Sequence, residues 1–600
     1  MQQTAHLYRR LLLCCISSVI LLEAVCAAPD SSAPIPTPNP EVVGQWLLDE
    51  TEGPTGEENW GIYDQSGHGN HGYRDPLGTL AERPTYSTDT PNPTPPDPTS
   101  WNHSLDFSLG SKARVEIPDS GSLDLTGDFT VETWINFSSL SGDQWFAGKR
   151  NIGGPESCYW LEWDTSDAQV NFFVGTSAGY ERARSQSFTP NTGQWYHIAG
   201  VHDATAGEVR LYIDGQLNNT SPAQSTVLTN NAPLYFGAWT GNQLPANAKL
   251  DDVRISNRVV PPEALTLHNS HGPARVIFGD SYETYAPLGD WFARAGGARN
   301  HWRTIEETSA VSIDPTAAHS HSPGHSLLLQ HTDADRSTDH EGSLYYNLPV
   351  AATRGAPIVG MTGWVSFANI DNVRLFWDQQ VWTGGETHYD VTQTLLIGGM
   401  TYFGNTKTWS VDPDYPIEYS ESLDDWHYYN LVIDYEKKEY VAFQFDNDVW
   451  DMRGQAISVL PGFFDPSLLP TIDHNIRLLE LASADRPADP WSAQFAQDDP
   501  QLIVYHPGDF DNDGDVDELD FEVMKLHWLQ SVPIGTLGDV NFDGKVDLQD
   551  FRAFKHDLFE GVPKNIRIPA SKVPEPVSHP LGGTALVLII SGRNQIARNR

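Results

Sequence analysis

Cysteine is scarce in this chain, so covalent cross-linking contributes little to its stability. There are 4 cysteines in 600 residues, and Cys14, Cys15 and Cys26 lie in or beside an apolar stretch near the N-terminus. Removal of that stretch leaves Cys158 alone, which excludes an intramolecular disulfide. Hydrophobic cores, with bound metal as a second source, must therefore hold the protein together.

Basic residues are also few. The chain has 37 Lys and Arg against 79 Asp and Glu, which gives a formal net charge of −42. A field of this sign repels phosphate backbones and attracts cations, so the composition excludes nucleic acid as a partner.

The sequence is rich in the residues of short strands and turns. Aromatic residues make up 11% of it, with 19 Trp, 49 Gly and 42 Pro. This composition is typical of β-rich domains, and the length predicts three or four domains of about 150 residues each. The fold class is therefore mainly β.

Alternating patterns mark individual strands. In residues 129–137, four apolar side chains alternate with polar or aromatic ones, the period of a half-buried strand. Residues 208–213 repeat the pattern, and Asp214-Gly215 then predicts a hairpin turn. No amphipathic helical pattern competes here, so we expect an antiparallel sandwich.

The N-terminus has the composition of an export signal. Arg9 and Arg10 precede an apolar run, and small residues follow at a cleavage site. We assign residues 1–28 to a signal peptide and residues 29–40, rich in proline, to a spacer. A lipid anchor at Cys26 is the alternative, although the preceding Glu-Ala-Val lacks the small residue usual before a lipidated cysteine.

Residues 41–272 resemble LamG-like domains, which are jelly-roll sandwiches of the concanavalin A-like class. The resemblance rests on six blocks in family order: GQWLLDE (44–50), DQSGHGNHG (64–72), LDFSLGSKARVEIPDSGSLDLTGDFTVETWI (105–135), GQWYHIAGVHD (193–203), VRLYIDGQ (209–216) and LDDVRISNRVV (250–260). It implies binding of glycans or proteins, in some members with a calcium ion, although such sandwiches also serve as spacers.

Residues 273–506 resemble the first sandwich. The spacing from Trp426 to Asp434 equals that from Trp195 to Asp203, and an alternating strand follows each segment. We therefore expect a second concanavalin A-like sandwich.

No catalytic motif stands out. Glu162 and Asp164 have the spacing of a glucanase carboxylate pair, but the third carboxylate of that motif is missing, so we predict no catalytic residues. His319 and His321 lie in a turn-rich stretch that supplies no further zinc ligands. Exposed tryptophans such as Trp239, Trp377 or Trp382 could stack on sugars, yet the sequence does not select one.

Two aspartate loops near the C-terminus have the spacing of calcium ligands. Oxygen donors recur at positions 1, 3, 5, 7, 9 and 12, with Gly514 and Gly544 at the sharp turn of position 6. The predicted metal ligands are Asp509, Asp511, Asp513, Asp515 (carbonyl), Asp517 and Asp520 in the first loop, and Asp539, Asn541, Asp543, Lys545 (carbonyl), Asp547 and Asp550 in the second.

Residues 507–562 resemble a type I dockerin, since position 12 is Asp and a helix follows each loop without one before it. The resemblance implies two calcium ions, folding coupled to calcium, and a cohesin-like partner. Positions 10 and 11, Glu518-Leu519 and Leu548-Gln549, depart from the small hydroxyl residues common in cellulosome enzymes. The module therefore binds another cohesin-like protein or acts as a calcium-stabilised cap within its own chain.

The tail, residues 563–600, resembles a PEP-CTERM sorting signal. It contains VPEP (573–576), the apolar LGGTALVLII (581–590) and a basic end. The resemblance implies a processing protease and export in a bacterium with an outer envelope, although the apolar segment is far shorter than the roughly 20 residues of a spanning helix.

Together these features lead to one hypothesis and two alternatives. We expect an exported or surface-exposed, non-catalytic protein with glycan-binding or adhesive sandwiches, a polysaccharide or glycoconjugate as ligand and a calcium-binding dockerin for protein attachment. A polysaccharide-degrading hydrolase or its accessory subunit, with an active site in residues 273–506, is the first alternative. A purely structural matrix protein is the second.

Overall fold

A computed structural model provides the fold. The structure describes residues 29–38, 40–50, 61–76, 83–91, 103–108, 113–151, 157–223, 226–239, 243–265, 274–279, 303–307, 311–316, 320, 326–331, 340–349, 357–368, 373–382, 394–403, 408–410, 414–416, 422–461, 471–480, 494–510, 516 and 518–555. The proposed signal peptide and sorting tail lie outside these residues. In the described part, no helix is both long and apolar enough to cross a membrane.

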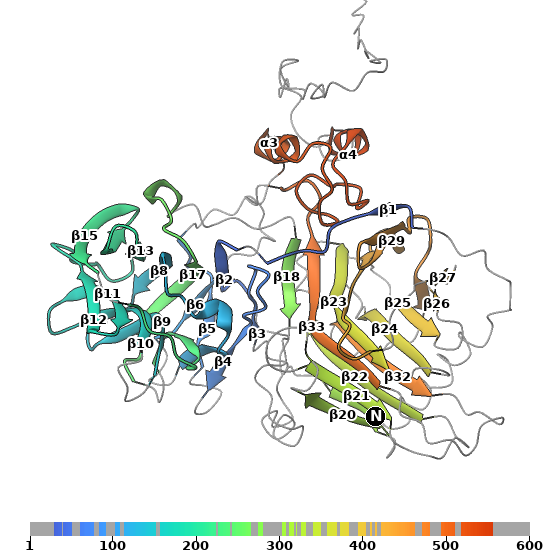
Figure 1. Ribbon diagram of the computed structural model, residues 1–600, viewed down its shortest axis with the longest axis horizontal. Helices are drawn as coiled ribbons and strands as arrows, with labels where there is room; N and C mark the ends of the chain where they lie inside the picture. The colour runs from blue at the N-terminus through green and yellow to red at the C-terminus, as the bar shows by residue number, and fades with distance from the viewer. Residues whose placement is uncertain are drawn as a thin grey trace, which may run out of the picture. The chain divides into compact units, whose positions relative to one another are not determined.

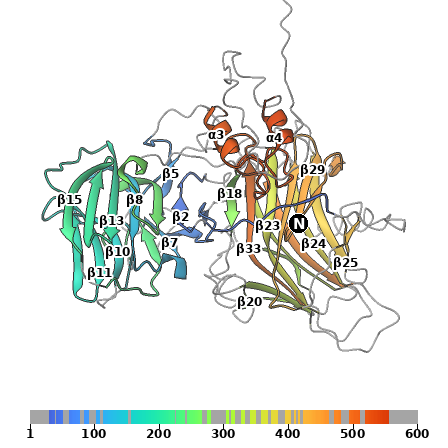
Figure 2. The ribbon, with the colours of Figure 1, turned by 45° about the horizontal axis from the view of Figure 1, so that its top comes forward.

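The first sandwich consists of two antiparallel sheets (Figures 1 and 2). One sheet has the order β15 (Gln216–Pro222), β14 (Glu208–Ile213), β13 (Trp195–Asp203), β8 (Phe129–Phe137), β17 (Ala248–Ser256), β6 (Ser104–Asp106) and β5 (Thr85–Ser87), with β2 (Val42–Trp46) also paired to β17. The other has the order β12 (Gly179–Arg184), β11 (Gln169–Thr176), β10 (Ser157–Asp164), β9 (Gln144–Arg150), β16 (Leu234–Phe236), β7 (Ala113–Ile117), β4 (Gly72–Pro76) and β3 (Gly61–Ile62). Two short 3₁₀ turns, Gly121–Leu123 and Pro262–Ala264, accompany them.

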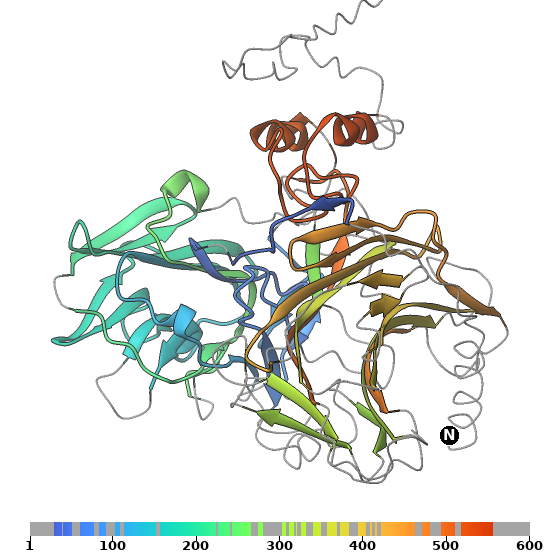
Figure 3. The ribbon, with the colours of Figure 1, turned by 45° about the vertical axis from the view of Figure 1, so that its right-hand side comes forward.

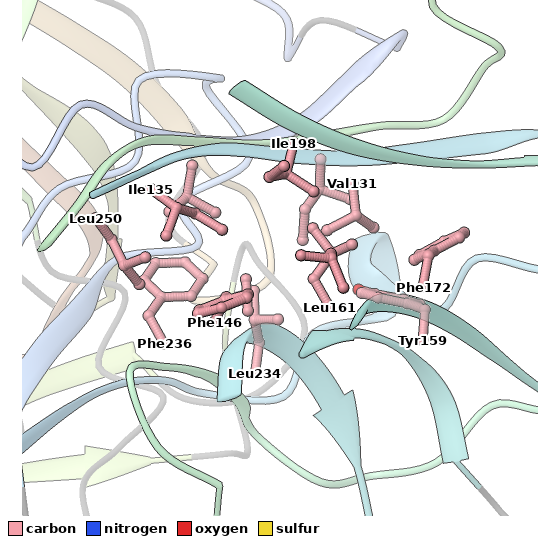
Figure 4. Close-up of a cluster of buried hydrophobic side chains, with 14 of the residues drawn as sticks. Val131, Ile135, Phe146, Tyr159, Leu161, Phe172, Ile198, Leu234, Phe236 and Leu250 are labelled. Carbon is pink, nitrogen blue, oxygen red and sulfur yellow. The ribbon is translucent and has the colours of Figure 1, made fainter. Parts of the chain in front are cut away.

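The predicted strand patterns are confirmed in this sandwich. The apolar residues of β8 and β14 face the core between the sheets, where side chains from both sheets point toward one another (Figure 4). Gly200 on β13 is needed there, because a Cβ at this position would lie 2.1 Å from Cγ of Phe172. The predicted turn has φ of 49° at Asp214 and 71° at Gly215, the left-handed values of a tight hairpin.

The second sandwich also has two sheets (Figure 3). One has the order β1 (Ser31–Ser32), β30 (Asp448–Asp451), β29 (Glu439–Phe445), β28 (His427–Asp434), β23 (Ile358–Ala368), β33 (Gln494–Tyr505), β21 (Ser326–His331) and β20 (Val311–Thr316), with β18 (Ala274–Gly279) also on β33. The other has the order β19 (Arg303–Glu307), β22 (His340–Pro349), β32 (Thr471–Glu480), β24 (Val373–Trp382), β25 (Thr394–Phe403), β26 (Thr408–Ser410) and β27 (Asp414–Pro416), with β31 (Ser458–Pro461) on β25.

The strand order of the first sandwich recurs in the second. The path β30-β29-β28-β23-β33 repeats β15-β14-β13-β8-β17, and β18 pairs with β33 as β2 pairs with β17. Asp252 on β17 and Asp499 on β33 share a positive φ, 45° and 46°. The internal similarity seen in the sequence therefore corresponds to a repeated topology, and the fold is mainly β as expected.

Two helices follow the sandwiches in the described part of the chain. The C-terminal module contains α3 (Glu518–Leu526) and α4 (Leu548–Ala553), each at the end of an aspartate loop. Strand β1 comes from the proline-rich segment, so residues 31 and 32 are part of a sheet as well as of the spacer.

Cys158 lies on β10 with no exposed surface, and burial raises the pKa of its thiol to about 12. We therefore expect a protein produced from residue 29 to give no reaction with a thiol reagent at neutral pH while folded. One thiol per chain should react after guanidinium denaturation. Rapid labelling of the native protein in an Ellman assay would contradict this core position.

Candidate functional site

The second aspartate loop brings three carboxylates together. Asp539, Asp543 and Asp550 each offer an oxygen atom, and these atoms all lie within 4.8 Å of one another. The N–H groups of Gly535 and Gly544 donate to Oδ2 of Asp539 at 3.0 and 2.9 Å. Hard oxygen donors gathered in this way suit calcium, so the residues present fit the ion that the spacing predicts.

The other predicted ligands of this loop lie beside the three carboxylates. Oδ1 of Asn541 accepts the N–H of Asp543 at 3.0 Å, and the N–H of Lys545 donates to Oδ1 of Asp543 at 3.0 Å. Asp547 caps α4, since its Oδ1 accepts the N–H of Gln549 at 2.6 Å. Asp547 is thus both a predicted ligand of the loop and the N-cap of the helix that follows it.

The first loop is described at its two ends. Asp509 and Asp520, at positions 1 and 12, are buried, and the N–H of Phe510 donates to Asp520. The remaining predicted ligands lie outside the described residues: Asp511, Asp513, Asp515 and Asp517.

Electrostatics favours a cation or protons at the second loop. Burial, with the charge of Asp550 as the next cause, raises the pKa of Asp539 well above its usual range. Burial also raises the pKa of Asp550 to about 6. Carboxylates held this close repel one another unless a positive ion or protons neutralise them.

The two loop-helix units pack through aromatic rings. The ring centroids of Phe521 and Phe551, the residues after position 12 of each loop, are 5.6 Å apart. Phe510 stacks on Phe554 at 6.1 Å. The loops are therefore joined by a small apolar core.

A second candidate site lies on the first sandwich, on the face of the β10-containing sheet that points away from the core. Alternation along β10 and β11 sends Tyr159 and Phe172 into the core, and it sends Trp160 and Phe173 to the opposite face. We call this surface the aromatic face, and it comprises Trp145, Trp160, Phe173, Tyr180, Tyr235 and Trp239.

Stacking orders the aromatic face. Trp160 lies parallel to Phe173 at a centroid distance of 4.5 Å, and Trp145 stacks between Trp160 and Trp239 at 5.9 and 6.0 Å. The guanidinium of Arg150 covers the rings of Trp239 and Trp160 at 4.2 and 4.8 Å. Tyr180 is the exposed member, with 46% of its surface accessible.

A polar row crosses the same face. Glu162 on β10 is paired with Asn171 on β11, and Nε1 of Trp160 donates to Oε2 of Glu162 at 2.8 Å. Asn171 is 1% exposed, and neither amide atom of its side chain has a hydrogen-bond partner in the described protein. A buried amide without partners favours a ligand or water that supplies them.

The two carboxylates that the sequence singled out have different environments. Burial raises the pKa of Glu162 to about 7. The hydroxyl of Ser166, which donates to Oδ1 of Asp164 at 2.6 Å, lowers the pKa of that carboxyl below its usual value. Near neutral pH Glu162 is therefore only partly ionised, whereas Asp164 is ionised.

Buried acids also occur where β2 and β17 meet. Burial raises the pKa of Glu50, Asp251 and Asp252, and Nη1 of Arg275 donates to Oδ2 of Asp49 at 3.0 Å. This set lies in the segments that carry the LamG-like blocks. Calcium in the sandwiches stays a prediction.

The structure describes one of the other residues that the sequence analysis considered. Trp239 belongs to the aromatic face, whereas the side chains of Trp377 and Trp382 lie outside the described set, as do His319 and His321. The sequence patterns do not single out Tyr180, Asn171 or Arg150, which the structure places on this face. The signal that could have found the face is SCYWLEWD, in which aromatic residues fall on both faces of one strand.

Comparison with known proteins identifies two domains. A family model described as "Concanavalin A-like lectin/glucanases superfamily" matches residues 109–266, and one described as "Dockerin type I domain" matches residues 507–559. The chain therefore carries a lectin-like jelly-roll domain and a type I dockerin domain. Dockerin domains generally bind calcium, and they are typical of extracellular or surface proteins. No curated protein matches the chain.

Several solved structures resemble parts of the chain. Domain 4 of AbnA, an extracellular arabinanase of Geobacillus stearothermophilus in complex with arabinotriose, is 18% identical, with 38% of this chain and 97% of that chain covered and a TM-score of 0.27. The IT-sialidase CBM40 of Ruminococcus gnavus bound to α2,3 sialyllactose is 11% identical, with 26% and 92% covered and a TM-score of 0.22.

Proton competition should control calcium binding at the second loop. Because burial raises the pKa of Asp550 to about 6 and raises the pKa of Asp539 well above its usual range, lowering the pH from 7.5 to 5 should protonate these ligands and weaken calcium binding. Without calcium the pH dependence has the opposite sign. Both groups have a higher pKa in the folded than in the unfolded protein, so the apo loop should lose stability as the pH rises above about 4, with the Asp550 contribution lost by about pH 6.

Calorimetric titration with calcium at pH 7.5 and at pH 5 would check the pH dependence of binding. Thermal melting in EGTA at the same two pH values would check the pH dependence of apo stability. The Asp539→Asn variant, which lacks one ligand charge, serves as the control. Calcium affinity that does not change with pH would contradict the assignment of this loop.

Proposed function

We propose that the protein is an exported, non-catalytic glycan-binding protein whose calcium-binding dockerin attaches it to a protein partner. The single observation that carries the glycan-binding part is the aromatic face, where stacked rings lie beside Glu162 and the unpartnered amide of Asn171. Aromatic rings pack against the apolar faces of sugars, and carboxylate and amide groups bond their hydroxyls.

The accessible edge of the aromatic face lies at β11 and β12. Tyr180 meets Trp160 edge-on at 5.3 Å, and the guanidinium of Arg182 lies 5.2 Å from the centroid of Phe173. Deeper rings are covered, since Trp160 is 2% exposed. A sugar would therefore enter beside Tyr180 and reach Glu162 and Asn171 from that side.

The dockerin offers a surface for a protein partner. Leu526, Leu529 and Leu548 are 73%, 67% and 46% exposed, and they are three of the five exposed large hydrophobic residues in the described part. Leu548 occupies position 10 of the second loop, the place where related dockerins carry partner-contacting residues. We assign these leucines to contact with a cohesin-like protein. Leucine at position 10 differs from the small hydroxyl residues that cellulosome enzymes commonly carry there.

Removal of the Tyr180 ring should weaken glycan binding. Loss of one stacking contact worth about 1.4 kcal/mol lowers affinity about tenfold. Retardation of Tyr180→Ala in gels containing plant, algal or bacterial polysaccharides measures the effect. Leu217→Ala, a change at a 55% exposed side chain on β15 of the other sheet, is the matched control. Equal retardation of both variants on every glycan that binds the parent would reject this face.

A hydrolase is the second candidate, favoured by the opposite pKa shifts of Glu162 and Asp164. Two carboxylates in different protonation states are what acid-base cleavage of a glycosidic bond requires. We expect no release of reducing ends from the same polysaccharides in calcium-containing buffer. Release that is lost in Glu162→Gln would place catalysis on this sheet, and release that persists would place it elsewhere, as in residues 273–506.

A further inference from the structure

The N-terminal segment 30–33 lies against the second calcium loop. Oγ of Ser31 donates to the main-chain oxygen of Asp543 at 2.6 Å. Gly544 faces Ala33 so closely that a Cβ added at Gly544 would lie 2.4 Å from Cβ of Ala33. Positions 5 and 6 of the loop are thus in direct contact with a segment more than 500 residues earlier in the chain.

The same segment is a strand of the second sandwich. Ser31 and Ser32 pair with Val449 and Asp448 of β30 at the edge of the sheet. The N–H groups of Asp30 and Ala33 extend the pairing, at 2.9 Å to the oxygen of Val449 and 3.0 Å to that of Asn447. Residues 30–33 therefore pair with β30 on one side and contact the second calcium loop on the other.

An apolar cluster joins all three parts. Ala33, 1% exposed, packs in one cluster with Val449 of β30 and with Ile534 and Phe542 of the dockerin. Tyr505 at the end of β33 meets Phe542 edge-on at a centroid distance of 5.2 Å. The dockerin is thus packed onto the sandwich through its second loop.

We propose that residues 30–33 form a strap that couples calcium binding at the second loop to closure of the edge of the second sandwich. The contacts that Ser31 and Ala33 make depend on where Asp543 and Gly544 are placed. Those positions depend on Asp539, Asp543 and Asp550 sharing an ion. An apo loop relaxes away from this geometry because its carboxylates repel one another.

The coupling must act in both directions. A strap that binds the ordered loop better than the relaxed one raises the affinity for calcium by the same factor by which calcium tightens the strap. The strap is independent of glycan binding, and it rests on the calcium assignment of the second loop.

Hydrogen exchange of the chain from residue 29 tests the strap without any substitution. We expect the amides of Asp30 and Ala33, together with those of β30, to exchange at least tenfold faster in EGTA than in calcium. The Asp539→Asn variant in calcium should match the EGTA state. Unchanged exchange in a protein that calorimetry shows to bind calcium at this loop would overturn the coupling and leave the calcium site intact.

A pair of neighbouring variants tests the reverse direction. Ala33→Glu places a charge in the apolar cluster, whereas Ser32→Glu adds the same charge at an exposed position of the same strand. We expect Ala33→Glu to weaken calcium binding at the second loop at least tenfold and Ser32→Glu to leave it within twofold. Equal affinities in the two variants would overturn the proposal.

Discussion

The repulsion among the buried carboxylates of the second aspartate loop is the constraint on which the C-terminal part of the protein depends. Asp539, Asp543 and Asp550 lie within a few ångströms of one another, and main-chain amides alone do not cancel their charge. A calcium ion bound among the three carboxylates would remove this cost and fix the loop. The apolar residues next to the ligands, Phe542 and Val546, are then held in their buried positions.

Burial of apolar surface stabilises the rest of the chain, since Cys158 has no disulfide partner. Both sandwiches bury this surface with the same strand order. Both also have an aspartate with positive φ in the corresponding strand, Asp252 in β17 and Asp499 in β33. A left-handed residue interrupts the regular pairing of a strand, and short polar side chains tolerate that conformation best. Asp251-Asp252 and Asp498-Asp499 therefore mark a structural irregularity that both sandwiches share.

The parts of the structure that follow local rules could be predicted from the sequence. Alternation placed Phe129 and Val131 in the core, and Asp214-Gly215 gave the hairpin, because neighbouring residues determine both features. The aromatic face was hidden because β10 is apolar on both sides, so its pattern does not separate Trp160 from Leu161. The strap was hidden because Ala33 lies in a short proline-rich stretch whose partners are more than 400 residues away.

The contacts of the dockerin concern the two alternatives for this module, which are binding of a cohesin-like protein and a cap within its own chain. Phe542, Ile534 and Gly544 face the protein's own chain, so part of the dockerin surface is occupied by an internal contact. Leu526, Leu529 and Leu548 stay exposed, so they are available for contact with a partner. The proposed attachment and the internal contact would therefore use different residues of one domain, and a calcium ion that fixes the loop before α4 would serve both. A cohesin-like partner that binds the leucines would not have to displace the strap.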